Sequence, residues 1–214
     1  MNAQASRNED MTHVVSLDDP SPCRSGETGK RALDILFAIL AIGVFALPML
    51  MIAGLVKLTS AGPVLYWSDR VGRNNQIFRM PKFRTMALNA PQVAAHHTES
   101  PAQYVTTVGK ILRRFSLDEL PQIYSILRGQ MSFVGPRPVL HVEDDLVGLR
   151  AAKGVHRLMP GLTGWAQING RASIPIALKV MYDEYYLKNR SLPLDLKILW
   201  VTLFKVLRAE DIHH

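Results

Sequence analysis

The chain has 214 residues, and 48% of them are hydrophobic, which is enough for one domain with a buried core. Its net charge of +7 and its pI near 9.7 favour anionic partners, which include nucleic acid, an acidic membrane surface and phosphorylated small molecules. The single cysteine, Cys23, excludes an internal disulfide and fits a reducing compartment.

The N-terminal part of the chain divides into a polar tail and an apolar segment. Residues 1–29 are polar and mixed in charge without an apolar period, which predicts a disordered tail. Ile35 to Val56 contains no charged residue. As a straight helix this run would reach roughly 33 Å, which matches a bilayer core. Residues 30–58 are therefore predicted to form a membrane helix.

Two membrane topologies fit this helix. Pro48 lies inside the apolar run and interrupts its backbone hydrogen bonds, and basic residues flank both ends of the run. Because basic flanks stay on the cytoplasmic side of a membrane, these features favour a bent, re-entrant helix that breaks at Pro48. A single span is the alternative, since prolines also occur in spanning helices.

A hairpin and a short helix follow the apolar segment. Val64 to Met86 alternates apolar and polar residues on either side of the turn sequence GRNN, which predicts a β-hairpin. Lys82 and Arg84 in its second arm are either solvated surface charges or part of a phosphate-binding surface. Residues 107–115 are predicted to form a short basic helix.

The stretch RRFSLDELPQIYSILRGQMSFVGPRP, residues 113–138, places two adjacent carboxylates between arginine clusters. Asp118 and Glu119 can hold a divalent metal ion, while arginines such as Arg113 and Arg137 bind phosphate oxygens. This arrangement predicts phosphoryl chemistry.

The same residues also fit a helix start. Ser116 and Glu119 have the spacing of a capping box. Pro121 fits better as a first helical residue, with the helix running to about Arg128 and Gly129 as its stop. In that version the two carboxylates lie at the positive end of the helix, so capping and catalysis do not exclude each other.

Two later loops are candidates for ligand binding. In SFVGPRP the prolines on both sides of Arg137 predict a rigid, extended path, which lowers the entropy cost of binding a phosphate. The loop PGLTGWAQINGR, which contains Gln167 and ends at Arg171, is rich in glycine and could bring backbone N–H groups close to a ligand. Its glycines follow no Walker or dinucleotide pattern, and a structural turn is the alternative.

Two helices are predicted at the C-terminal end, over Ile176 to Asn189 and over about Leu194 to Arg208. In the second helix Lys197, Lys205 and Arg208 fall in one narrow sector of an otherwise apolar surface. This pattern fits a helix at a membrane interface, or a helix buried in the core with only the basic stripe exposed.

Four motifs stand in order along the chain: KFRTM at 82–86, SLDELPQ at 116–122, VGPRP at 134–138 and PGLTGWAQINGR at 160–171. Together, and behind a proline-broken apolar segment, they resemble the bacterial sugar transferase family, the monotopic polyprenyl-phosphate phosphoglycosyl transferases. The resemblance covers nearly everything from Lys30 to about Arg208. One departure is Leu47 before Pro48, where some members carry a serine.

The resemblance implies transfer of a sugar-1-phosphate from a UDP-sugar to undecaprenyl phosphate, with release of UMP, as the first membrane step of surface glycan assembly. It implies Mg²⁺ as the cofactor, membrane lipid as a partner and no nucleic acid. The sequence does not specify the sugar, and a homo-oligomer is compatible with it.

The resemblance also implies roles for individual residues. Asp118 matches the nucleophile that forms a covalent phosphosugar-aspartate, and Glu119 matches its partner; both would bind the metal. Arg113, Arg137 and Arg171 match positions associated with the active site. Lys82, Arg84 and Gln167 are further candidates for substrate binding.

The expected architecture is an α-rich α/β domain with a re-entrant N-terminal helix, a short β-hairpin and amphipathic helices at the membrane interface. Residues 59–214 would form the catalytic domain on the cytoplasmic face of the bacterial inner membrane. A rival hypothesis is a non-catalytic basic adaptor that binds anionic lipid or nucleic acid.

Overall fold

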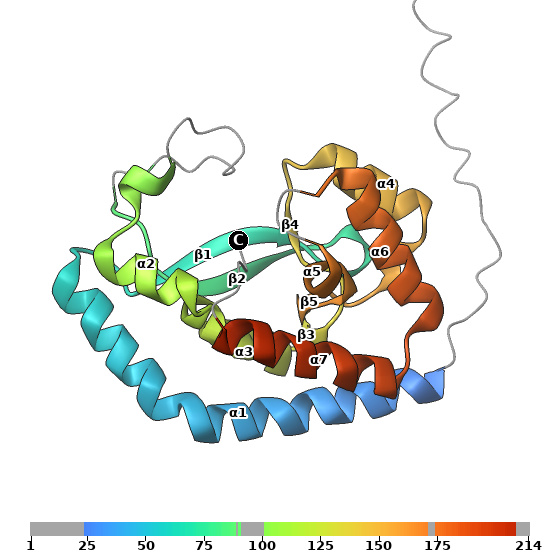
Figure 1. Ribbon diagram of the computed structural model, residues 1–214, viewed down its shortest axis with the longest axis horizontal. Coiled ribbons are helices and arrows are strands. Elements are labelled where there is room, and N and C mark those ends of the chain that lie inside the picture. Colours follow the sequence, from blue (N-terminus) through green and yellow to red (C-terminus); the bar gives the residue numbers. More distant parts are fainter. Residues whose placement is uncertain (1–23, 89, 91–100, 171–173, 209–214) are drawn as a thin grey trace, which may run out of the picture.

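The computed structural model describes residues 24–88, 90, 101–170 and 174–208. It confirms the predicted α-rich α/β class with a long apolar N-terminal helix and a small sheet (Figure 1). The helices are α1 Arg24–Thr59, α2 Thr107–Arg114, α3 Ile123–Leu127, α4 Asp144–Ala152, α5 Trp165–Asn169, α6 Ile176–Asn189 and α7 Leu192–Leu207. The strands are β1 Leu65–Val71, β2 Ile77–Phe83, β3 Ser132–Val134, β4 Val139–Leu140 and β5 Gly161–Thr163. Within the described ranges, 3-10 helices span Arg73–Asn75, Pro101–Tyr104, Leu117–Gln122 and Val155–Arg157.

Helix α1 is one continuous, curved helix along one side of the molecule (Figure 1). It begins at Arg24, so residues 24–29, which the sequence assigns to the polar tail, form its first turns; residues 1–23 lie outside the described residues. Pro48 lies inside the helix and does not end it. Residues Glu27–Thr59 are long and apolar enough to cross a membrane by length and composition, and little of the most apolar part is buried.

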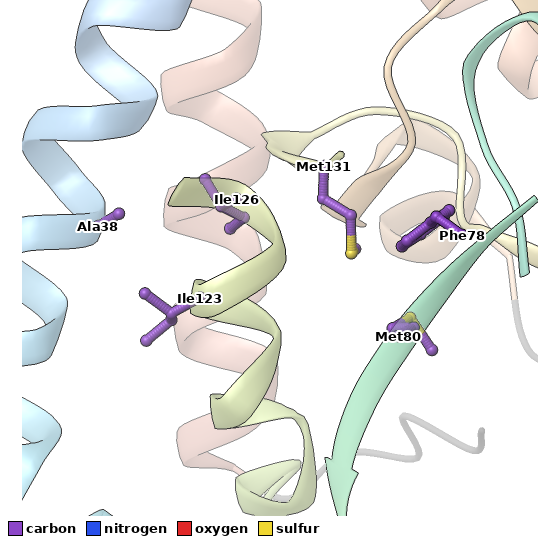
Figure 2. Packing of buried hydrophobic residues seen from close by; sticks show 6 residues of the cluster. All are labelled: Ala38, Phe78, Met80, Ile123, Ile126 and Met131. Carbon is purple, nitrogen blue, oxygen red and sulfur yellow. The ribbon is translucent and has the colours of Figure 1, made fainter. Parts of the chain in front are cut away.

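Both halves of α1 pack against the same domain. Ala38 in the first half joins a buried cluster with residues of α3 and β2 (Figure 2). Ile52 and Val56 in the second half join another cluster, with Phe83 of β2 and Leu112 of α2. The outward side of the helix stays apolar and exposed, with Leu50 at 71% and Leu58 at 86% exposure. An amphipathic division of this kind leaves a large apolar surface without a protein partner.

The predicted hairpin is confirmed. β1 and β2 pair antiparallel, with Tyr66 opposite Lys82, and the turn contains Asn74 and Asn75 at positive φ, which asparagine tolerates well. On its other edge β1 pairs with β4, where Arg70 is opposite Leu140. This pairing places the segment that follows residues 136–138, the Pro-Arg-Pro turn, beside the hairpin.

A second, parallel pair joins β3 to β5. Two backbone segments cross there so closely that only glycine fits. A Cβ atom on Gly161 would lie 2.1 Å from the backbone nitrogen of Gly135, and a Cβ atom on Gly164 would lie 2.1 Å from the backbone oxygen of Gly135. The loop also contains a short strand followed by a short helix, β5 and α5, neither of which was predicted from the sequence.

The C-terminal helices agree with the predicted ranges, and α7 begins slightly earlier, at Leu192. Asp195 of α7 accepts hydrogen bonds from Tyr186 of α6 at 2.6 Å and from Lys30 of α1 at 2.5 Å, so one carboxylate joins three helices. The basic residues of α7 face α5: Lys205 donates to the carbonyl oxygen of Ile168 at 2.7 Å, and Lys197 lies 5.6 Å from the ring centroid of Trp165. The exposed surface of α7 is instead largely apolar, with Leu192, Leu196, Trp200, Leu203, Phe204 and Leu207.

Candidate active site

The two central carboxylates lie in the 3-10 helix Leu117–Gln122, and both are buried, Asp118 at 3% and Glu119 at 4% exposure. The predicted capping box does not form, because Ser116 adopts a left-handed conformation with φ of 53° and its side chain makes no capping hydrogen bond. Pro121 lies within this 3-10 helix, and α3 begins only at Ile123. Gly129, at φ of 77°, follows the end of α3 as predicted.

Glu119 is held by two cations from different parts of the chain. Lys82 of β2 donates from Nζ to Oε1 at 2.6 Å, and Arg137 donates from Nη2 to the same oxygen at 2.6 Å and from Nη1 to Oε2 at 3.4 Å. Burial acts to lower the pKa of Arg137, but the Glu119 carboxylate outweighs it, and the pKa is raised. Burial lowers the pKa of Lys82.

Asp118 has a different environment from its neighbour. Its Oδ1 atom is buried and has no hydrogen-bond partner. Burial, the largest cause, and the charge of Glu119 raise the pKa of Asp118, while Lys82 and Arg113 oppose that rise. Arg113 is oriented by a hydrogen bond from Nε to Oγ1 of Thr85 at 2.9 Å. The site therefore contains one paired carboxylate and, beside it, one carboxylate with an unused oxygen.

The remaining predicted residues fall in different places. Arg84 donates to the carbonyl and the hydroxyl oxygen of Ser60 at 2.8 and 2.6 Å, so it fastens the strand to the end of α1. Gln167 lies in α5, and neither its Oε1 nor its Nε2 atom has a hydrogen-bond partner. Arg171 lies outside the described residues.

One cation at the site, Arg70, is not among the site residues predicted from the sequence. The guanidinium of Arg70, on β1, interacts electrostatically with both Arg137 and Glu119. The strand pairing that brings Arg70 to the Pro-Arg-Pro turn is with β4, far along the chain. Alternation along the predicted hairpin could have indicated it, because Arg70 and Lys82 lie on the same face.

The described residues contain no cluster of three or more metal-ligating side chains of the His, Cys, Asp or Glu type. Both oxygens of Glu119 accept from Lys82 or Arg137, which leaves Oδ1 of Asp118 as the carboxylate oxygen without a donor. Mg²⁺ commonly keeps several waters and takes one or two carboxylates together with substrate phosphates. The residues present therefore fit a Mg²⁺ ion that is held mainly by a phosphorylated substrate.

Residues 25–209 match the model of a family described as bacterial sugar transferase. The chain belongs to this family. It is therefore an enzyme, which argues against the non-catalytic adaptor. Over 193 residues it is 42% identical to the exopolysaccharide production protein ExoY of Sinorhizobium fredii, with 83% of this chain and 85% of that protein covered.

Larger members of the family are also similar to the chain. It is 40% identical, over 183 residues, to the UDP-N-acetylgalactosamine-undecaprenyl-phosphate N-acetylgalactosaminephosphotransferase of Aeromonas hydrophila. It is 38% identical, over 210 residues, to the UDP-glucose:undecaprenyl-phosphate glucose-1-phosphate transferase of Escherichia coli. These matches cover 83% and 94% of this chain but only 43% and 45% of those transferases.

Proposed function

We propose that the protein transfers a sugar-1-phosphate from a UDP-sugar to undecaprenyl phosphate and releases UMP. The family membership supports the general reaction, because relatives named for this transfer use different sugars. The observation that carries the proposal to this chain is the unpaired oxygen of Asp118, which lies beside Lys82, Glu119 and Arg113 in a buried site.

The proposed chemistry has two displacements at one phosphorus atom. In the first, an oxygen of Asp118 forms a bond to the β-phosphorus of the donor, and the bond from that phosphorus to the bridging oxygen breaks, so UMP leaves with the electron pair. In the second, an oxygen of the lipid phosphate bonds to the same phosphorus, and the bond to Asp118 breaks. The aspartate carboxylate is thereby regenerated.

The other side chains have electrostatic roles in this proposal. Lys82 and Arg137 are fixed by Glu119, so their positive charges are already in place when charge develops on the transferred phosphoryl group. Arg113 is held next to the nucleophile by Thr85. Asp118, through Oδ1, would be the protein ligand of Mg²⁺, which when bound would neutralise phosphate charge. Glu119 could join it only by giving up a hydrogen bond from Lys82 or Arg137.

An exchange assay tests both the reaction and its covalent step. Purified protein in detergent with Mg²⁺ and undecaprenyl phosphate should release UMP from one or two members of a panel of UDP-sugars. With the same donor and no lipid, labelled UMP should exchange into the UDP-sugar, since only a covalent intermediate allows this. UMP release without exchange would point to direct attack by the lipid phosphate, and no release from folded protein would contradict the transferase proposal for that panel.

We further propose that α1 enters the membrane and returns to the same side, with residues 59–214 on the cytoplasmic face of the inner membrane. Two observations support a re-entrant helix. Ala38 and Val56, in opposite halves of α1, both pack against the catalytic domain, and the exposed side of the helix is apolar in both halves. A helix that crosses the membrane in a straight line would separate one half from the domain.

Cysteine labelling tests this topology. Cys23 precedes α1, and a second cysteine introduced by Thr59→Cys would stand at its other, exposed end. Both cysteines are expected to react with a membrane-impermeant maleimide in inverted membrane vesicles. Neither is expected to react when the reagent is added to the outside of intact spheroplasts. Single-cysteine versions serve as matched controls. Reaction of the two cysteines from opposite sides would establish a spanning helix instead.

A further inference from the structure

Arg70 lies on the side of the hairpin that faces the candidate active site. In β1 it follows Tyr66 and Ser68 at alternate positions, and Tyr66 is paired with Lys82. Side chains at alternate positions, and side chains directly opposite across antiparallel strands, share a face of the sheet. Arg70 and Lys82 therefore project from the same face, with Arg70 nearer to β4 and the Pro-Arg-Pro turn.

The guanidinium of Arg70 is oriented through one of its nitrogens, and its two terminal nitrogens are available to a ligand. Its Nε atom donates to Oγ of Ser68 at 3.0 Å, and Ser68 is buried. Within the described ranges, no ion pair or other hydrogen bond engages either terminal nitrogen of Arg70. A half-buried guanidinium fixed at Nε presents these two nitrogens as a preorganised fork, which suits the oxygens of a phosphate.

The charges around Arg70 favour an anion at this position. Burial and the neighbouring charge of Arg137 lower the pKa of Arg70, against the opposing effects of Glu143 and Glu119. Glu119 is already bound to Lys82 and Arg137, and Oε1 of Glu143 accepts the backbone N–H of Leu140 at 3.2 Å. Arg70 and Arg137 face the charges of Glu119 and Glu143, but Glu119 also pairs with Lys82, so one positive charge is left for a ligand to neutralise.

The position of Arg70 separates it from the reacting phosphorus. A nucleophile must lie roughly 3–3.5 Å from the atom that it attacks, so the transferred phosphoryl group would lie at Asp118, near Lys82 and Arg113. Arg70 is four positions along β1 from the residue opposite Lys82, which corresponds to about 13 Å between the backbones. The charges that act most on Arg70 are those of Arg137, Glu143 and Glu119, whereas Lys82, Glu119 and Arg113 act on Asp118. These different neighbours place a phosphate bound by Arg70 beside the reacting group as a second phosphate.

We propose that Arg70 is a phosphate-binding residue of the active site and that its two terminal nitrogens bind the phosphate next to the one being transferred. This inference rests on the proposed transferase function. The shared chemistry is a phosphate oxyanion, which has two sources: the α-phosphate of the nucleotide, which leaves in UMP, and the phosphate of the lipid acceptor.

The test compares Arg70→Met with Arg79→Met. Arg79 is a matched control, because it is paired with Asp69 on the opposite face of the same hairpin and lies over the ring of Trp67 at 5.5 Å. The measurements are the Kd for UMP by calorimetry, the KM for the UDP-sugar in lipid-free UMP exchange and the KM for undecaprenyl phosphate in the complete reaction. Thermal melting checks that each variant is folded.

If Arg70 binds the nucleotide phosphate, Arg70→Met should weaken UMP binding by about 10- to 100-fold, as expected for a lost charged hydrogen-bonded contact, and leave the KM for the lipid unchanged. Arg70→Lys, which keeps the charge but not the fork, should fall between wild type and Arg70→Met. A rise confined to the KM for the lipid would assign the same site to the acceptor phosphate.

The proposal is overturned if folded Arg70→Met has the UMP affinity and both KM values of Arg79→Met. It is also overturned if the losses scale only with a lower melting temperature. UMP binding needs no turnover, so a failed inference about Arg70 is distinguishable from a failed transferase function, in which even the wild type releases no UMP.

Discussion

Asp118→Asn is expected to abolish both sugar-phosphate transfer and lipid-free UMP exchange. An amide cannot form the proposed acyl phosphate, and loss of a nucleophile typically lowers kcat by about 10⁴-fold or more. Initial rates of UMP release and of label exchange, measured with the same preparation, check this result. Exchange at an undiminished rate would show that Asp118 is not the nucleophile.

The same substitution is expected to leave the fold as stable as before, or more stable, at neutral pH. Burial raises the pKa of Asp118 above its ordinary value of 3.8, so the folded protein binds this proton more tightly than the unfolded chain does. The contribution of Asp118 to stability is therefore complete below about pH 4 and is lost as the pH rises through the raised pKa. At pH 8 the buried, charged carboxylate lowers the free energy of unfolding, and the neutral asparagine removes this destabilisation.

Melting curves without Mg²⁺ or substrate would measure this effect. Between pH 4 and pH 8 the melting temperature of Asp118→Asn should fall less than that of the wild type. A variant that melts several degrees below the wild type at pH 8 would contradict this prediction, because it would show that Lys82 and Arg113 stabilise the charged carboxylate more than burial destabilises it. The activity of Asp118→Asn would then have to be measured at a temperature at which the variant is shown to be folded.

Local sequence signals predicted much of the fold. The GRNN turn, with Asn74 and Asn75 at positive φ, specifies the hairpin, and the charge-free run specifies α1. Helix α6 coincides with its predicted range, which lies between Pro175 at its own N-cap and Ser191 at the N-cap of α7. The strand β5 and the helix α5 are too short to produce a period, and close backbone packing at Gly135, Gly161 and Gly164 defines them instead.

The candidate site was predictable only where its residues stand in a recognisable motif. Lys82 and Arg84 are close in sequence, yet Lys82 pairs with Glu119 while Arg84 binds Ser60 at the end of α1. Nothing local distinguishes them, because each partner comes from a distant segment. Arg70 was missed for the same reason, since its place beside Arg137 depends on pairing between β1 and β4.

Glu119→Gln is expected to destabilise the protein, in contrast to the substitution at the adjacent carboxylate. It would leave the ammonium of Lys82 and the guanidinium of Arg137 without their shared anion, with side-chain exposures of only 15% and 29%. Removing one partner of a buried ion pair costs about 3–5 kcal/mol, and the partial exposure of Arg137 lowers the expectation to about 2–4 kcal/mol. For a chain of this size that corresponds to a melting temperature lower by about 4–16 °C.

A double-mutant cycle gives this expectation a sharper form. If the cost of Glu119→Gln comes from the unpaired cations, then adding Lys82→Met should restore part of the lost stability, so the two substitutions together cost less than the sum of the single changes. Glu184→Gln is the control, because its carboxylate pairs with Lys188 and Lys153 at the surface, where ion pairs contribute little. Additive losses would mean that Glu119 stabilises the fold by other contacts, and its two cations would then not be fixed by this carboxylate.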